Sequence, residues 1–384
     1  MNMKQPAKKL GFGFMRLPLL DEKDQKAIDL AQVEQMVDRF LARGFTYCDT
    51  AWMYHDFKSE EAVGKALVDR HPRDAFTIAT KMPDMMLKSK EQVPEIFAKQ
   101  KEKLHVDAFD YYLVHDMNHV NYEKAKKYGA IEFLRGKRES GEIRCLGFSF
   151  HDTPEVLDRI LEENPFFEFV QLQINYLDWE SAGIQSHKCY DVATKHGLPV
   201  VVMEPVKGGT LANPPQDVKE MLRAMHPDWS PAEWAIRFAA SLPNVMVVLS
   251  GMSTMAQLDE NTGFMQDFTP LTAEEQALLL QAAERIRASI AVPCTGCRYC
   301  VEASKCPKNI LIPNYFALFN TRKLMHRRDF SPEIEYYENY ISQGHGKASD
   351  CIVCRSCERV CPQHIPISEW MPKVTADLEN GQGF

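Results

Sequence analysis

The chain has 384 residues, a formal net charge of -8 and 45% hydrophobic residues. This length exceeds an average domain and suits a large barrel with an attached domain. The acidic balance argues against a general nucleic-acid surface or an anionic-membrane surface as partner. No apolar core follows the lysines near the start, as it would in a signal peptide, and the longest apolar runs have only strand length. These features predict a cytoplasmic protein that acts on neither nucleic acid nor membrane.

The eleven cysteines are unevenly placed. Cys48, Cys145 and Cys189 are scattered, whereas the other eight lie between residues 294 and 361. Such density in a secreted protein would indicate disulfides, but nothing in this sequence directs export. Metal binding is therefore the better interpretation of the C-terminal cysteines.

Short apolar runs alternate with segments of helical periodicity from the N-terminus onward. The expected strands cover residues 12–15, 45–48, 77–80, 111–114, 146–149, 170–173, 200–203 and 246–249. The expected helices cover residues 33–41, 60–68, 93–104, 123–138, 154–163, 181–196, 231–240 and 254–262, and a further one covers 271–290. Eight alternating pairs predict an α/β fold of the (β/α)8 TIM-barrel type, whose active site lies at the C-terminal ends of the strands.

Three groups able to handle protons come at the ends of consecutive expected strands. These are Asp49, Lys81 and His115, and a phenol, Tyr54, lies five residues after the first of them. Each has a structural alternative when taken singly: the aspartate as a turn or helix cap, the tyrosine and histidine as packing residues. Because all three strand-end groups fall where a barrel has its active site, a shared catalytic role is favoured.

The order Asp49, Tyr54, Lys81, His115 resembles the catalytic tetrad of the aldo-keto reductase family, and the resemblance covers roughly residues 10–288. Carbonyl reduction by hydride needs a proton donor at the oxygen. A free phenol has a pKa of about 10, and a nearby ammonium lowers it. The resemblance thus implies that Tyr54 is the acid, tuned by Lys81, which Asp49 keeps charged, while His115 donates to or orients the carbonyl oxygen of a small-molecule aldehyde or ketone.

No early Gly-x-Gly-x-x-Gly opens a βαβ unit, so a dinucleotide is not expected to bind in the Rossmann manner. The same resemblance implies NADP or NAD extended across the barrel mouth. The matching positions are Ser149 and Gln171 for the carboxamide, Pro205, Val206, Lys207, Gly208 and Gly209 for the pyrophosphate, and Gly251, Met252, Ser253, Gln257, Glu260 and Asn261 for the adenosine end. Arg16 is expected either to reach the cofactor or to form a surface ion pair.

Three positions depart from the family pattern. Phe150 replaces a common Asn, Met203 stands where many members have the Tyr that stacks on the nicotinamide, and Gln257 stands where NADP-dependent members often have an Arg. Without that guanidinium a charge-assisted contact to the 2′-phosphate is lost. The choice between NADPH and NADH is therefore open.

Two cysteine motifs are the most specific signals in the chain. They read Cys294-x2-Cys297-x2-Cys300-x5-Cys306-Pro307 and Cys351-x2-Cys354-x2-Cys357-x3-Cys361-Pro362. The second has the bacterial ferredoxin spacing, in which the cysteine before proline reaches the other cluster. One [4Fe-4S] cluster is thus expected on Cys294, Cys297, Cys300 and Cys361, and the second on Cys351, Cys354, Cys357 and Cys306. Structural zinc is the alternative.

Helix-like segments at residues 315–324 and 332–341 separate the two motifs, which resembles an α-helical ferredoxin-like domain. The expected division is a barrel at residues 1–290 and this domain at 291–384, similar to the iron-sulfur aldo-keto reductases of bacteria and archaea. Because hydride carries two electrons and a cluster accepts one, a mediator would be needed between them; a flavin would serve, but no motif establishes one. The interpretations are an NAD(P)H-dependent carbonyl reductase, an electron-transfer reductase coupled to a redox partner protein, and a non-enzymatic redox-sensing protein.

Overall fold

The computed structural model describes residues 6–181, 184–288, 291–294, 296, 298–302, 304, 306–324, 331–361 and 363–380. The chain forms two compact units. The first spans Met1–Ile174, Lys188–Pro205 and Ile236–Leu271, and the second spans Asn175–His187, Val206–Ala235 and Thr272–Phe384. Two of the five boundaries fall within helices, α8 (Ser186–Lys195) and α10 (Pro231–Ser241).

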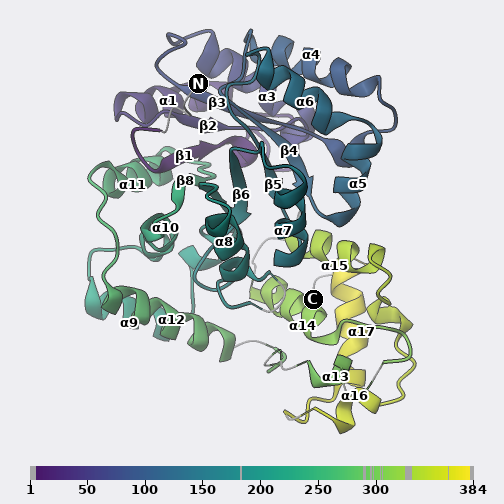
Figure 1. Ribbon diagram of the computed structural model, residues 1–384. Helices are drawn as coiled ribbons and strands as arrows, with labels where there is room; N and C mark the ends of the chain where they lie inside the picture. The colour runs from purple at the N-terminus through teal and green to yellow at the C-terminus, as the bar shows by residue number, and fades with distance from the viewer. Residues whose placement is uncertain are drawn as a thin grey trace. The chain divides into compact units, whose positions relative to one another are not determined.

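The first unit contains a closed parallel barrel in which each strand pairs with its neighbours in sequence, and β8 pairs with β1 (Figure 1). The strands are β1 Leu10–Gly13, β2 Tyr47–Asp49, β3 Thr77–Met82, β4 Tyr111–Met117, β5 Leu146–Phe150, β6 Phe169–Gln173, β7 Val200–Met203 and β8 Val245–Ser250. The ring of Tyr111 lies 4.9 Å from that of Tyr47 and 5.5 Å from that of Phe169. Side chains from alternate strands therefore meet and fill the barrel, which confirms the predicted fold class.

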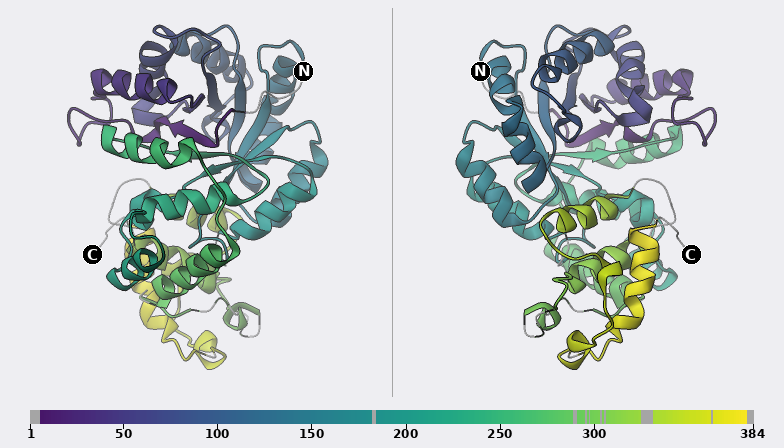
Figure 2. Two further views of the ribbon diagram at one scale, coloured as in Figure 1. Left: turned by 90° about the vertical axis from the view of Figure 1, so that its left-hand side faces the viewer. Right: turned by 90° about the vertical axis from the view of Figure 1, so that its right-hand side faces the viewer.

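Helices surround the strands of this unit (Figure 2). They are α1 Leu30–Ala42, α2 Tyr54–Phe57, α3 Ser59–Val63, α4 Gln92–Leu104, α5 His119–Lys127, α6 Ala130–Glu139, α7 Pro154–Glu163 and α11 Met255–Gln266, with shorter turns η1 Phe14–Arg16, η2 Gly64–Val68 and η3 Asp84–Met86. Amphipathic periodicity is visible in α1, where Val33, Met36, Val37 and Phe40 are buried.

Several expected elements of the first unit differ from those observed, most clearly one helix and the first strand. The single helix expected at 123–138 is two helices, α5 and α6. Gly129 separates them, because its φ of +71° interrupts the helix, and it is the N-cap residue of α6. The first strand covers Leu10–Gly13 rather than residues 12–15, and it ends at Gly13 because Phe14 to Arg16 already turn as a 3-10 helix. The apolar pattern predicts where both elements lie along the chain, but the backbone conformation determines the residues at which they end.

The second unit is helical around a core of aromatic and aliphatic side chains that includes Tyr315, Phe316, Tyr337 and Met371. Its elements are η4 Lys207–Ala212, α9 Gln216–Met225, α12 Ala273–Ala288, α13 Tyr299–Glu302, α14 Ile312–Leu324, α15 Pro332–Ser342, η5 Ala348–Asp350, α16 Ser356–Arg359 and α17 Ile367–Leu378. The expected helices at 315–324 and 332–341 are confirmed as α14 and α15, whereas α9 was not expected.

Two further sequence expectations concern the whole chain. In the part of the chain that the structure describes, no helix combines the length and the apolar character needed to cross a membrane. Residue 290, at which the barrel domain was expected to end, lies outside the described residues.

Candidate active site and metal centre

A buried ion pair joins the ends of β2 and β3. The Lys81 ammonium donates to Oδ1 of Asp49 at 2.6 Å and to the backbone oxygen of Thr50 at 2.7 Å. Side-chain exposure is 0% for the lysine and 3% for the aspartate. Two charges so far from water require each other, because either one alone would remain buried and uncompensated.

Tyr54 and His115 complete the group of four residues that the sequence singled out. Nζ of Lys81 lies 5.0 Å from the centre of the Tyr54 ring. The rings of Tyr54 and His115 meet edge to face, with centroids 6.1 Å apart and planes inclined by 81°. The structure therefore brings an ammonium, a phenol and an imidazole to the C-terminal ends of three neighbouring strands.

The environment sets the charge state of these groups. Burial lowers the pKa of Lys81, but Asp49 and Tyr54 outweigh it, so the pKa lies above its usual value. Burial raises the pKa of Tyr54, an effect that the Lys81 ammonium opposes. Burial and then the positive charge of Lys81 hold the pKa of His115 well below its usual range. The site thus has a charged lysine, a protonated phenol and a neutral imidazole at neutral pH.

One imidazole nitrogen is uncommitted. Nδ1 of His115 is buried and has no hydrogen-bond partner among the residues that the structure describes. Burial without a partner costs free energy for a polar atom. A neutral imidazole in this position keeps hydrogen-bonding capacity for a bound molecule.

An ion pair beside Tyr54 was not foreseen in this form. Arg16, at the end of η1, donates from Nη1 and Nη2 to Oε1 of Glu204 at 3.2 Å each. Exposure of the two side chains is 24% and 13%, so the pair is half-buried rather than on the open surface. Burial raises the pKa of Tyr54, and the charge of Arg16 makes a small contribution, beside that of Lys81, in opposing this rise. No sequence signal marks Glu204, which lies 188 positions from its partner.

Ser149 and Gln171 are direct neighbours on β5 and β6. Their Cα atoms are register partners, and both side chains are buried. Oγ of Ser149 accepts a hydrogen bond from the backbone N–H of Asp116 at 2.8 Å. Burial raises the pKa of Asp49, and Lys81 and the side chain of Gln171 oppose this rise. Two adjacent polar side chains in a buried setting fit the donor and acceptor pattern of a carboxamide.

The loop after β8 gathers other sequence-predicted residues. Oγ of Ser253 donates to the backbone oxygen of Arg16 at 2.8 Å, and the backbone N–H of Ser253 donates to Oε1 of Gln257 at 2.8 Å. Nδ2 of Asn261 donates to Oγ of Ser250 at 3.0 Å. The ends of β1 and β8 and the start of α11 are thereby connected.

The remaining expected cofactor residues of the two units differ in exposure. Gly251 and Glu260 are exposed, Met252 and Pro205 are buried, and Val206 is half-buried. None of these observations assigns them a ligand.

Lys207 in the second unit is buried among carboxylates. Its Nζ donates to Oδ1 and Oδ2 of Asp178 at 2.5 and 2.6 Å, and Oε1 of Glu333 lies 3.8 Å away. Gly208 and Gly209 follow with φ of +61° and +98°, a region that favours glycine. The charge of Lys207 is therefore already balanced by carboxylates of the same unit.

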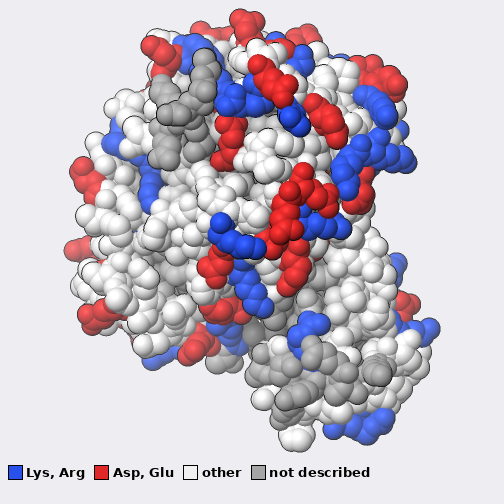
Figure 3. All heavy atoms as spheres, viewed as in Figure 1, with Lys and Arg blue, Asp and Glu red and all other residues white. Residues whose placement is uncertain are grey.

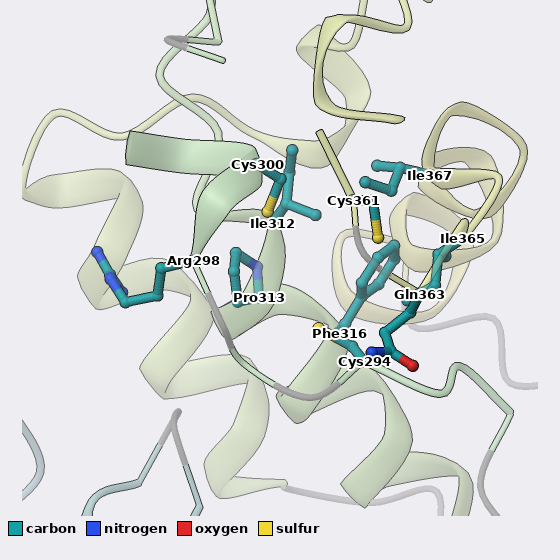
Figure 4. A pocket seen from close by; sticks show the side chains of 10 residues that line it. All are labelled: Cys294, Arg298, Cys300, Ile312, Pro313, Phe316, Cys361, Gln363, Ile365 and Ile367. Atoms are coloured by element: carbon teal, nitrogen blue, oxygen red, sulfur yellow. The ribbon is translucent and has the colours of Figure 1, made fainter. Parts of the chain in front are cut away.

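The first cysteine hollow of the second unit is lined by Cys294, Cys300 and Cys361 together with Phe316. In Figure 4 the sulfur atoms of Cys300 and Cys361 point toward the space beside the Phe316 ring. Cys297, the fourth expected ligand, lies outside the described residues. A cysteine of the second motif thus faces the same hollow as two cysteines of the first.

The second hollow is lined by Cys306, Cys351, Cys354 and Cys357. Burial and Glu358 raise the pKa of Cys357 to about 11, with smaller contributions from Cys306 and Cys351. Hydrogen bonds from Ser356 lower the pKa of Cys354 and favour its thiolate. All four cysteines expected for the second cluster therefore surround one space, and the donor set suits iron bound through thiolates.

These features define a class of parallel barrel proteins that carry a cysteine-rich C-terminal domain. The model of the aldo/keto reductase family matches residues 9–284, and the chain belongs to this family. The model of the 4Fe-4S dicluster domain matches residues 293–366.

Individual relatives are more distant. The protein described as uncharacterized oxidoreductase YqkF from Bacillus subtilis (strain 168) is 23% identical over 257 residues, which cover 59% of this chain and 79% of that protein. The holo form of aldo-keto reductase AKR11C1 from Bacillus halodurans is 24% identical, with a TM-score of 0.57 over 72% of this chain and 96% of that chain. An aldo-keto reductase from Klebsiella pneumoniae in complex with NADPH is 21% identical, with a TM-score of 0.59 over 73% and 95%. At these identities the two structures show a shared fold.

Proposed function

We propose that this chain reduces a small-molecule aldehyde or ketone with NADPH or NADH, with Tyr54 as the general acid. The observation that carries the proposal is the buried Lys81–Asp49 pair, which lies against the Tyr54 ring. Membership in the aldo/keto reductase family supports the reaction class. The NADPH in the Klebsiella pneumoniae structure supports a nicotinamide cofactor.

Each of the four residues has its own role in placing a charge or moving a proton during the reduction. The phenolic O–H of Tyr54 delivers its proton to the carbonyl oxygen as negative charge develops there. The Lys81 ammonium stabilises the phenolate that remains, and the Asp49 carboxylate keeps that ammonium charged. His115, held neutral by burial and by Lys81, donates a hydrogen bond to the same oxygen.

The nicotinamide supplies the hydride when it is bound. Ser149 and Gln171 would hold its carboxamide, because they are adjacent, polar and buried. The loop from Pro205 to Gly209 and the residues from Gly251 to Asn261 would hold the rest of the dinucleotide. Arg16 would lie close to it, kept in place by Glu204. Because residue 257 is glutamine rather than arginine, both NADPH and NADH remain candidates.

The two hollows would each hold one [4Fe-4S] cluster. Cys294, Cys297, Cys300 and Cys361 form one expected set, and the lining of the first hollow supports it. Cys306, Cys351, Cys354 and Cys357 form the other, supported by the second hollow. The domain boundary after residue 290 and a cytoplasmic location, where thiolates stay reduced, are parts of the same proposal.

Transfer of deuterium tests the reductase function directly. NADPH and NADH deuterated at C4 are incubated with the anaerobically purified holoprotein and a panel of aldehydes and ketones. The expected result is one deuterium on the former carbonyl carbon of the alcohol, detected by mass spectrometry, and equal loss of reduced cofactor. Cofactor oxidation without labelled alcohol would contradict hydride transfer to a carbonyl.

A ferredoxin-coupled electron-transfer reductase is the second candidate, favoured by the surface around Cys354. This cysteine is exposed, and the neighbouring apolar side chains Ile352 and Val353 are 57% and 55% exposed. Arg355 is exposed beside them, and Figure 3 shows basic side chains at the edge where Figure 1 labels α16. An exposed ligand beside apolar and basic side chains gives an acidic one-electron carrier access.

EPR spectra of the holoprotein separate the two candidates. Signals of reduced clusters after addition of NADPH or NADH alone would show that nicotinamide and clusters communicate, and would call for a bound flavin as mediator. The carbonyl reductase with independent clusters predicts silence with NAD(P)H and signals only with dithionite. Iron content is measured first, so that silence from an empty protein is recognised.

A further inference from the structure

A strained left-handed turn follows Tyr54 directly. His55, Asp56 and Phe57 have φ of +52°, +48° and +71°. The left-handed region is unfavourable for a residue with a side chain, and it is normally visited by single residues or by glycine. Three such residues in a row persist only where surrounding contacts fix them, and strain of this kind concentrates at functional sites.

His55 fixes the start of the turn. Its Nε2 accepts a hydrogen bond from the backbone N–H of Leu17 at 3.0 Å, and its Nδ1 lies 3.0 Å from the backbone oxygen of Gln25. Both contacts are satisfied only when the ring is neutral and carries its proton on Nδ1. Burial lowers the pKa of His55, which favours that form. The residue next to Tyr54 is thereby tied to the loop between η1 and α1.

Lys103 fixes the end of the turn. From α4 its Nζ donates to the backbone oxygen of Phe57 at 3.0 Å and lies 4.1 Å from the centre of the Trp52 ring. The rings of Trp52 and Phe57 meet edge to face at 6.2 Å. Glu60, whose Oε2 is 3.7 Å from Nζ, keeps the lysine in this position.

We propose that His55 and Lys103 are positioning residues that hold this turn and so set the place of the Tyr54 phenol. Tyr54 lies between Trp52, whose ring Lys103 contacts, and His55, which is hydrogen-bonded to Leu17 and Gln25. A displacement of about 1 Å at a reacting group costs roughly 100-fold in rate. The inference rests on the proposed role of Tyr54 as acid and adds the residues that place it.

Two substitutions at residue 55 remove one contact each. In His55→Gln the side chain still reaches Leu17 but loses the Nδ1 donor, and in His55→Asn a donor remains toward Gln25 but the acceptor is lost. Each is expected to lower kcat about 10- to 100-fold, with less than about a threefold change in the dissociation constant of NADPH. Lys103→Met, which keeps the stem over Trp52 and removes the donor to Phe57, is expected to act in the same direction.

Substitutions at residue 56 test whether the left-handed turn itself controls kcat. Asp56 is exposed, so Asp56→Gly removes the left-handed strain and Asp56→Ala keeps it, while both remove the same carboxylate. When Asp56→Gly is added to His55→Gln, kcat is expected to rise at least about threefold above that of His55→Gln alone. When Asp56→Ala is added instead, kcat is expected to stay low or to fall further. Equal responses to glycine and alanine, or full turnover in all three anchor variants, would overturn the proposal.

Tyr54→Phe serves as the reference in the same assays. Loss of turnover in Tyr54→Phe together with full turnover in the His55 and Lys103 variants would remove only the positioning role. Full turnover in Tyr54→Phe itself would instead remove the acid on which the proposal rests. The two failures are therefore distinguishable.

Discussion

Replacing Tyr54 by phenylalanine is expected to lower kcat/KM for carbonyl reduction by about 100- to 10,000-fold, the range of general acid catalysis. The substitution removes one oxygen and its proton, whereas the ring that meets His115 and lies by Lys81 remains. Steady-state reduction of the best substrate from the carbonyl panel measures the loss. Binding of NADPH, followed by its fluorescence, is expected to change less than about threefold.

The pH dependence of the reaction provides a second sign of the phenol. Because burial raises the pKa of Tyr54, the phenol stays protonated at neutral pH, which is the form that reduction requires. Oxidation of the alcohol requires the phenolate, so its rate is expected to rise with pH. In Tyr54→Phe this rising limb should disappear.

Tyr128→Phe is the matched control, since it removes a phenolic oxygen from a half-buried tyrosine after α5. Its kcat/KM is expected to equal that of the unchanged protein. Equal turnover in Tyr54→Phe and Tyr128→Phe would exclude Tyr54 as the acid and would direct attention to His115 as the proton donor.

Much of the barrel and of the proton-handling group could be predicted from local sequence. Three strand-length apolar runs end in Asp49, Lys81 and His115. These runs predict both the fold and the place where the three groups meet, because a barrel places the ends of its parallel strands at one face. The lysine and aspartate then pair because both would otherwise be buried as lone charges.

Contacts between distant residues could not be predicted. Lys207 matches a family loop by its sequence, yet its charge is balanced by Asp178 and Glu333, which lie 29 and 126 positions away. The turn after Tyr54 gives no signal either, because none of its three left-handed residues is a glycine. Both features depend on tertiary contacts that override local preference.

The cysteine motifs illustrate the opposite case, in which spacing predicted the lining of two hollows. Each hollow combines cysteines of one motif with the last cysteine of the other. Three closely spaced thiolates hold three corners of a cluster, and the fourth corner must be reached from elsewhere. If each hollow holds one cluster as proposed, the crossed arrangement would link the two ends of the domain through the clusters.

Pairs of substitutions are expected to reveal this crossing. Cys300→Ala and Cys361→Ala each remove a ligand of the first hollow, so each is expected to lose about half of the iron, and the double variant no more than that. Cys357→Ala removes a ligand of the second hollow, so its combination with Cys361→Ala is expected to lose nearly all. Iron and sulfide per chain, with EPR of the dithionite-reduced proteins, measure the outcome.

The alternative arrangement assigns each motif its own cluster and reverses the result. Cys361→Ala with Cys357→Ala would then lose about half of the iron, and Cys361→Ala with Cys300→Ala nearly all. Because the comparison is between two double variants that share Cys361→Ala, a general loss of stability from that substitution affects both equally. The difference between them therefore reports only which cysteines bind the same cluster.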